Sequence, residues 1–121
     1  MNLRSKLLAQ AKKPGSRVRD ITIELDDEIV EAYVARPPLT ARDKAMSLVN
    51  SDTGEIKNYS KLQAMAIVNC LYDCDDGTRV FDDADVDVLA GMACGDWFDE
   101  VSPDCVNLIL PAQDKEGNSE G

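Results

Sequence analysis

The stretch from Tyr59 to Tyr72 constrains the fold more than any other part of this 121-residue chain. Its second half, Ala64 to Tyr72, is apolar almost all round and is interrupted by Asn69 alone. A helix with one apolar stripe lies on a protein surface, whereas a helix that is apolar on most sides has to be covered from several directions. We therefore predict a buried helix over residues 59–72 and expect the other elements to pack around it.

The segment before this helix has the pattern of a β-hairpin. Apolar and polar residues alternate from Asp20 to Leu25, as they do in a half-buried strand. A second strand is predicted over Ile29 to Ala35, after a short acidic turn, and the pair Pro37 and Pro38 ends it, because proline has no N–H to donate to a strand ladder.

Two more helices are predicted from the residues that begin them. Thr40, followed three residues later by Asp43, is a variant of the capping box and predicts a helix that runs through Val49. Asp82 and Asp83 place carboxylates at the start of a helix over residues 84–92, where the positive end of the helix dipole favours them.

A last helix is predicted to start close to Pro103. Ser102 is a suitable N-cap and Pro103 suits the first helical position, so the helix is expected to run through Leu110 and to stop at Pro111. Trp97 and Phe98 lie upstream, in what we interpret as a connected turn. Sequence alone leaves open whether these two aromatic residues anchor the core or form an exposed interface.

These elements predict an α+β fold, mainly helical, in a single domain with an N-terminal β-hairpin. We place the domain at residues 17–111, which is a length that buries one core. Residues 1–16 are predicted to form a basic amphipathic arm, because its leucines recur at helical spacing. Residues 112–121 are predicted to be a disordered tail, since no apolar residue appears from Gln113 onward.

Charge is distributed very unevenly along the chain. Eleven carboxylates and one base, Arg79, lie between Asp73 and Asp104, whereas six bases precede the first acid, Asp20. A molecule with a basic and an acidic pole docks on a complementary protein or on copies of itself, and we expect self-association into head-to-tail multimers in which the basic arm of one copy meets the acidic segment of the next. The residues that we predict to bind partners are Arg4, Leu7, Leu8, Lys12, Lys13 and Arg17 at the basic pole, with Asp83, Asp87, Trp97 and Phe98 near the acidic one.

The residues that carry most enzyme chemistry are scarce in this chain. It contains no histidine, so a Ser–His or Cys–His nucleophile pair is impossible, and we predict no enzyme and no cofactor. The acids around Gly77 do not match a calcium loop, because Tyr72 and Cys74 stand where that loop needs carboxylates. We interpret them as caps of a turn, and the four cysteines as small reduced core residues without the spacing of a zinc site.

Composition also bears on partners and location. A pI near 4.3 argues against general nucleic-acid binding, which needs a dominant positive field. No run of about 18 apolar residues is present to span a membrane, and residues 1–13 lack the continuous apolar core of a secretory signal. We expect a cytosolic protein that binds other proteins.

The order of motifs in the second half resembles a known family. The run Val68-Asn69-Cys70-Leu71-Tyr72-Asp73 is followed by Asp76-Gly77, Val80-Phe81, Asp82-Asp83-Ala84-Asp85 and Leu89. This order resembles that of the tail assembly chaperones of long-tailed bacteriophages. The resemblance implies a protein without enzymatic activity that coats the tape measure protein, helps recruit tail-tube subunits, acts in the host cytoplasm and is absent from the mature virion.

Two alternatives from other classes remain open at this point. An acidic mimic of DNA that inhibits a nucleic-acid enzyme would present its carboxylates in phosphate-like rows. A small metal-dependent enzyme would gather carboxylates such as Asp83 and Asp87 around a cation.

Overall fold

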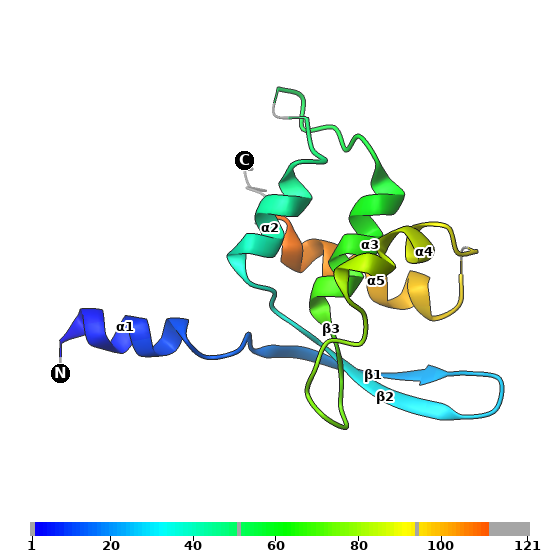
Figure 1. Cartoon of the computed structure of the whole chain (residues 1–121), viewed down its shortest axis with the longest axis horizontal. Helices are drawn as coiled ribbons and strands as arrows, with labels where there is room; N and C mark the ends of the chain where they lie inside the picture. Colours follow the sequence, from blue (N-terminus) through cyan, green and yellow to red (C-terminus); the bar gives the residue numbers. More distant parts are fainter. Residues whose placement is uncertain (1, 51, 94, 112–121) are drawn as a thin grey trace, which may run out of the picture.

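Helix α3 (Tyr59–Cys70) is the central element of the computed structural model, which describes residues 2–50, 52–93 and 95–111. The side chain of Asn58 caps it by accepting a hydrogen bond from the backbone N–H of Lys61 at 3.2 Å. Most of its second half is buried, and the other helices and the sheet surround it (Figure 1). The predicted buried helix is confirmed up to Cys70.

The two residues that follow Cys70 belong to a strand and not to the helix. Strand β3 (Leu71–Asp73) leaves α3 without a loop and pairs with the hairpin. In this conformation Leu71 stays buried, and the ring of Tyr72 stacks on that of Tyr33 with centroids 5.4 Å apart. The prediction that the helix extends to Tyr72 is wrong. An extended backbone buries Leu71, stacks Tyr72 on Tyr33 and adds a third strand to the sheet.

The predicted hairpin is confirmed. Strands β1 (Arg17–Glu24) and β2 (Ile29–Ala35) pair antiparallel, and β3 adds to the other side of β2, giving the order β1-β2-β3. The register places Ile21 opposite Ala32, and both side chains are buried on the face that covers the helices. The fold is therefore a small single α+β domain with an N-terminal hairpin.

Helix α2 (Leu39–Met46) begins one residue before Thr40, so the predicted capping box is wrong. Its N-cap is Pro38, which makes no side-chain cap but fixes an extended entry into the helix. The helix also ends before Val49, which instead forms an isolated β-bridge with Ile56 across the following loop.

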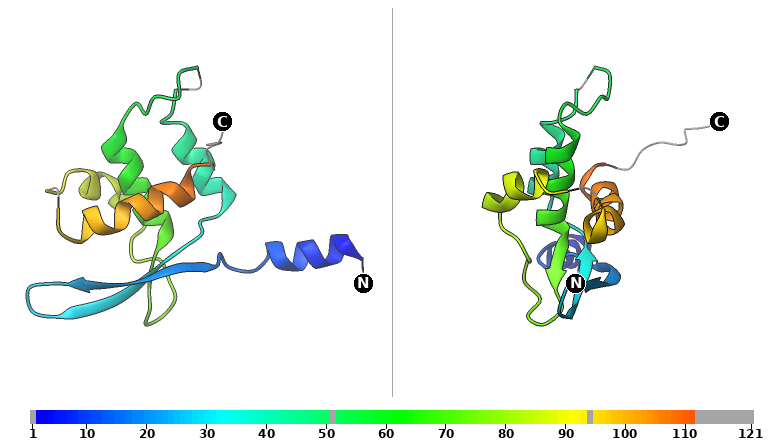
Figure 2. Two further views of the ribbon diagram at one scale, coloured as in Figure 1. Left: turned by 180° about the vertical axis from the view of Figure 1, so that it is seen from behind. Right: turned by 90° about the vertical axis from the view of Figure 1, so that its right-hand side faces the viewer.

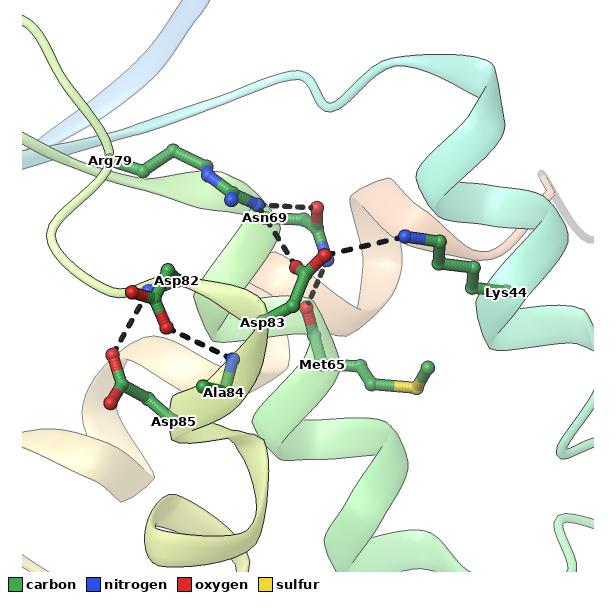
Figure 3. Close-up of polar contacts among 8 residues, drawn as sticks. All are labelled: Lys44, Met65, Asn69, Arg79, Asp82, Asp83, Ala84 and Asp85. Carbon is green, nitrogen blue, oxygen red and sulfur yellow. Dashed lines mark hydrogen bonds and ion pairs between the residues drawn. The ribbon is translucent and has the colours of Figure 1, made fainter.

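The predicted helix start at Asp82 and Asp83 is confirmed, and the structure adds a capping box that the sequence analysis did not predict. Asp82 accepts a hydrogen bond from the N–H of Ala84 at 2.9 Å, and Asp85 accepts one from the N–H of Asp82 at 2.9 Å, which completes a capping box (Figure 3). The element it begins is shorter than predicted. A 3-10 turn, η1 (Asp83–Asp85), leads into α4 (Val86–Ala90), which ends before Met92.

Helix α5 (Asp96–Ile109) is continuous through Pro103, so the prediction of a helix start at Ser102 is wrong. Ser102 is buried, and its hydroxyl accepts a hydrogen bond from the side-chain amide of Gln63 at 3.4 Å. Pro103 faces solvent. Residues on both sides of the proline share one buried face at spacings of three and four, and this face packs across α3 (Figure 2): Phe98, Val101, Ser102, Cys105, Val106 and Ile109.

The predicted role of the cysteines as reduced core residues holds for two of them. Cys70 of α3 and Cys105 of α5 are buried free thiols, and Cys74 is a half-buried one. The Cys70 thiol donates to the Cys105 carbonyl at 3.7 Å. The neighbouring Cys70 thiol, first, and burial, second, raise the pKa of the Cys105 thiol far above its ordinary value. Cys94 and the predicted disordered tail (residues 112–121) lie outside the described residues.

This raised pKa predicts an alkaline loss of stability. An unfolded cysteine thiol has a pKa of about 8.5, whereas the thiol of folded Cys105 stays protonated above that pH. The contribution of Cys105 to the free energy of unfolding is therefore complete below pH ~8.5 and falls as pH rises above it. We expect the free energy of unfolding to fall by up to about 1.4 kcal/mol per pH unit above pH ~8.5. Urea unfolding between about pH 7 and about pH 9.5 measures this. Cys105→Ala is the control, and an unchanged slope in that variant would contradict the assignment.

Candidate functional site

The N-terminal arm is a helix that stands clear of the body. Helix α1 (Leu3–Ala11) is capped by Asn2, whose side chain accepts a hydrogen bond from the N–H of Ser5 at 2.8 Å. Figure 1 shows α1 projecting away from the domain beyond the start of β1. Leu3, Leu7 and Leu8 keep 69%, 60% and 43% of their surface exposed, so the described residues of the domain leave the leucines of this helix uncovered.

The leucines of α1 share one side of the helix with Arg4. Leu3, Leu7 and Leu8 follow at spacings that place them within one arc, and Arg4 stands in the same arc next to Leu8. The helix is therefore less strongly amphipathic than the leucine spacing alone predicts. A surface that binds it needs apolar contacts and acidic groups close together.

A close backbone contact fixes the arm to the domain. A Cβ atom at Gly15 would lie 1.9 Å from the carbonyl oxygen of Arg36, so no other residue fits there without displacing the backbone. The N–H of Arg36 also donates to the carbonyl of Ser16 at 3.1 Å. The arm thus leaves the domain from a fixed point beside the end of β2.

The two arginines that follow the arm belong to the domain. The Arg17 guanidinium lies 3.9 Å from the centre of the Tyr33 ring and pairs with Asp20 at 3.7 Å. Arg19 pairs with Glu100 at 3.3 Å and also with Asp104. Arg17, predicted as a partner-binding residue, is thus already engaged inside its own chain. Among the described residues no carboxylate pairs with the four remaining bases of the N-terminal segment: Arg4, Lys6, Lys12 and Lys13.

A groove of about 490 Å³ lies at the other end of the domain, between the outer half of the hairpin and the loop after β3. Its apolar lining includes Leu25, which is 50% exposed, and Ile29, which is 62% exposed. Four acids are among its lining residues: Glu28, Glu31, Asp73 and Asp75. We call this feature the acid-rimmed groove.

Trp97 lines the groove, whereas Phe98 belongs to the core. The Trp97 ring is half-buried, stacks on Phe81 with centroids 6.1 Å apart and lines the groove. Phe98 is 7% exposed and belongs to the core, so its prediction as a partner-binding residue is wrong. The reason is the helical turn itself, which points two adjacent side chains about 100° apart.

No family model, curated protein or solved structure matches this chain. The groove and the arm therefore have to be interpreted from their own chemistry.

The two surfaces lie at opposite ends of the molecule. α1 projects at one end, and the tip of the hairpin lies at the other, as both Figure 1 and Figure 2 show. The tip adds three further acids next to Trp97, where a second hollow adjoins the groove and shares Glu28 with it: Glu24, Asp26 and Asp27. The basic arm and the acids of the groove and the hairpin tip are thus separated in space, although the acids of the tip lie outside the segment from Asp73 to Asp104 that the sequence singled out.

Asp83 belongs to a polar network on a different side of the domain (Figure 3). It pairs with Lys44 and Arg79, each at 3.4 Å, and Arg79 donates to the side chain of the buried Asn69 at 3.0 Å. The hydrogen bond and charge of Lys44, followed by the charge of Arg79, lower the pKa of Asp83. The network connects α2, α3 and η1. Asp83 thus braces the fold, and Asp87 is exposed in the first turn of α4.

The acids after β3 cap the turn, as predicted. Asp73 accepts a hydrogen bond from the N–H of Asp75 at 2.8 Å. Asp76 accepts from the hydroxyl of Thr78 at 2.7 Å and from its N–H at 3.0 Å, and these bonds lower the pKa of Asp76. Within the described residues, no three acidic or cysteine side chains gather closely enough to hold a metal ion.

In the part of the chain that the structure describes, no helix is both long and apolar enough to cross a bilayer.

Proposed function

We propose that this protein is a tail assembly chaperone of a long-tailed bacteriophage, a protein without enzymatic activity that binds the tape measure protein and helps recruit tail-tube subunits. Two kinds of support converge on this proposal. The motif order from Val68 to Leu89 resembles that family. The domain also leaves the leucines of α1 and the apolar lining of the groove uncovered, and most of the described acids between Asp73 and Asp104 make contacts within the fold.

The observation that carries the proposal is the exposed leucine surface of α1. A chain that folds alone normally covers such side chains, whereas a protein that holds another polypeptide keeps them available. The tape measure protein is long and helical, so its apolar faces suit a short helix that docks through leucines at helical spacing. The high net charge, −10, keeps such a surface soluble before the client arrives.

The positions of the acids favour binding over catalysis and over mimicry of DNA. Glu100 and Asp104 pair with Arg19, and Asp83 pairs with Lys44 and Arg79. Four more acids accept hydrogen bonds that cap a turn or a helix start: Asp73, Asp76, Asp82 and Asp85. These contacts divide the acidic segment among ion pairs, caps and the groove rim. A phosphate-like row would instead require the carboxylates of this segment to stand free along one surface, whereas the free acids of the hairpin tip border the apolar side chains of Leu25 and Trp97.

Co-expression with the tape measure protein of the same phage tests the proposal. We expect the tape measure protein to be insoluble alone and soluble in a complex with this chain, and the complex to capture tail-tube subunits. Deletion of residues 2–12 should reduce recovery of the complex at least tenfold. Purified virions should lack the chain by mass spectrometry. A tape measure protein that stays insoluble in its presence, or a chain retained in virions, would contradict the proposed function.

A further inference from the structure

We infer that the free edge of strand β1 accepts an extended segment of a partner protein as an added strand of the sheet, and that this segment alternates apolar and basic side chains. The inference goes beyond the proposed function, because it concerns a surface other than the arm and a partner segment that is extended. It rests on unpaired backbone groups along residues 20–24, on a hollow beside them and on the acids that border it.

The backbone of β1 leaves hydrogen-bonding groups unpaired along one edge. β1 is the first strand in the order β1-β2-β3, and no described segment pairs with its other side. The N–H of Leu25 donates to the carbonyl of Glu28 at 2.8 Å, which makes these two residues a hydrogen-bonded pair of the hairpin. Hydrogen-bonded and non-hydrogen-bonded pairs alternate along an antiparallel ladder, so Glu24, Thr22 and Asp20 direct their N–H and C=O groups away from β2.

A contact on the other side of β2 supports this alternation. Glu31 lies opposite Thr22, and its carbonyl accepts a hydrogen bond at 3.4 Å from the N–H of Cys74, just after β3. Glu31 therefore turns its backbone groups away from β1, and Thr22 turns its own toward the free edge. An added strand would thus pair with residues 20, 22 and 24.

The inner end of this edge is protected against pairing, whereas the outer half is open. The register shifts between Arg17 and Arg19, and the Arg19 side chain reaches Glu100 and Asp104 of α5. A bulge and an inward-facing charge are two devices that keep an edge strand from pairing with another chain. Over residues 20–24 the register is regular and the inward-facing side chains are apolar and buried, so a strand can pair there.

The side chains around the outer half define the chemistry of the added segment. A hollow of about 360 Å³ lies against this part of β1, and Ile23 and Trp97 supply its apolar lining. Glu24 also lines the hollow and, like Asp26 and Asp27 of the hairpin tip, pairs with no base among the described residues. Successive side chains of a strand point to opposite faces, so an alternating segment would place apolar side chains against Trp97 and basic ones beside the acids.

Charge disfavours two other occupants of this edge. Residues 112–121 contain three acids and one base, so their sequence matches neither the acids nor the apolar hollow. A second copy that paired through its own β1, in the register centred on Thr22, would set Asp20 of each copy opposite Glu24 of the other, and like charges directly opposite are destabilising. A different protein with basic side chains meets neither obstacle.

An NMR titration of the full chain with a synthetic peptide tests the inference. The probe is an acetylated and amidated peptide of about nine residues in which lysine and valine alternate. At saturation we expect hydrogen exchange of the Thr22 and Glu24 N–H groups to slow by about tenfold or more, because these donors face the added strand. The N–H groups of Ile21 and Ile23 already bond to β2 and should change little.

A matched peptide separates strand pairing from attraction between charges. N-methylation of its central residues removes the donors on both edges of the peptide, while its side chains and charge stay the same. We expect the methylated peptide to leave the exchange of Thr22 and Glu24 unchanged. Equal slowing by the two peptides would overturn the inference.

A substitution in β1 tests the same contact from the side of the protein. Thr22→Pro removes an N–H that faces the free edge and keeps the ladder with β2, which is a place where strands tolerate proline. Thr22→Val is the matched control, because it loses the same hydroxyl bond to Glu31, at 3.0 Å, and keeps the N–H. We expect Thr22→Pro to weaken peptide binding by about tenfold or more and Thr22→Val to bind like the unmodified protein. Circular dichroism and the melting temperature confirm that both variants fold.

A further variant tests the charge without touching the backbone. Glu24→Lys keeps every donor of β1 and should also weaken peptide binding, because it reverses the charge beside the hollow. Exchange of Thr22 and Glu24 that stays unchanged at saturating peptide would overturn the inference. Protection of the same N–H groups without peptide, rising with protein concentration, would overturn the choice of a partner protein and assign the edge to a second copy. Because the experiment uses neither the client nor the arm, its outcome is independent of the test of the proposed function.

Discussion

Replacing Leu62 by alanine is expected to lower the free energy of unfolding by about 3 kcal/mol. Leu62 is fully buried in α3, the helix against which α5, α4 and α2 all pack. The loss has two parts. The deleted methine and methyl groups no longer gain from burial, and the cavity they leave is lined by side chains from several elements that cannot all close in. Since a domain of this size is stable by roughly 5–15 kcal/mol, the effect is large.

Leu39→Ala is the matched control for this change. Leu39 is the first residue of α2 and is 73% exposed, so the same truncation removes little buried surface and should change stability by less than about 0.5 kcal/mol. Urea unfolding followed by circular dichroism measures both variants. Similar losses in the two would mean that α3 is not the centre of the core.

The elements that depend on hydrophobic pattern were predictable from the sequence. The apolar residues in the second half of α3 can be satisfied only by burial on several sides. The alternation of apolar and polar residues from Asp20 to Leu25 fits a half-buried strand. Both signals arise from side chains close together in sequence. The acidic capping box at Asp82 was equally predictable, because its hydrogen bonds join residues two and three apart.

Predictions from single capping residues failed where packing acted against them. Thr40 and Ser102 are both good N-caps, yet α2 starts before Thr40 and α5 runs through Ser102. In α5, five buried apolar positions on one face lie on the two sides of Ser102, and their burial outweighs a cap worth about 1 kcal/mol. β3 was missed for a similar reason, since its partner strand lies far away in sequence.

The candidate site was predictable only in part. The arm was found because leucine spacing and basic charge are local features. The groove was not, because it joins Ile29 of the hairpin, Asp75 of the loop after β3 and Trp97 of α5, which are brought together by the fold alone. The charge counted along the sequence likewise could not show that Arg19 pairs with Glu100 and Asp104. It also could not show that the acidic hairpin tip lies next to the groove.

Replacing Pro103 by alanine is expected to stabilise the protein by about 2 kcal/mol. Two effects oppose each other. Proline in a helix interior costs about 3 kcal/mol relative to alanine, because it lacks the N–H that would bond the carbonyl four residues earlier and its ring strains that turn. Alanine, in turn, frees the unfolded chain, which lowers stability by about 0.4–1 kcal/mol. Since Pro103 faces solvent, the change leaves no cavity.

The sign of this effect distinguishes the two possible starts of the last helix. If the helix began at Ser102, Pro103 would occupy the first helical position, where its missing N–H costs nothing, and alanine would be neutral or slightly destabilising. In a continuous α5, alanine restores an interior hydrogen bond. Pro111→Ala, just beyond the helix, is the control, and thermal unfolding should show a change there of less than about 0.5 kcal/mol. In a continuous α5, Trp97 and the buried face of the helix belong to one rigid element. The helix therefore fixes the wall of the groove to the core.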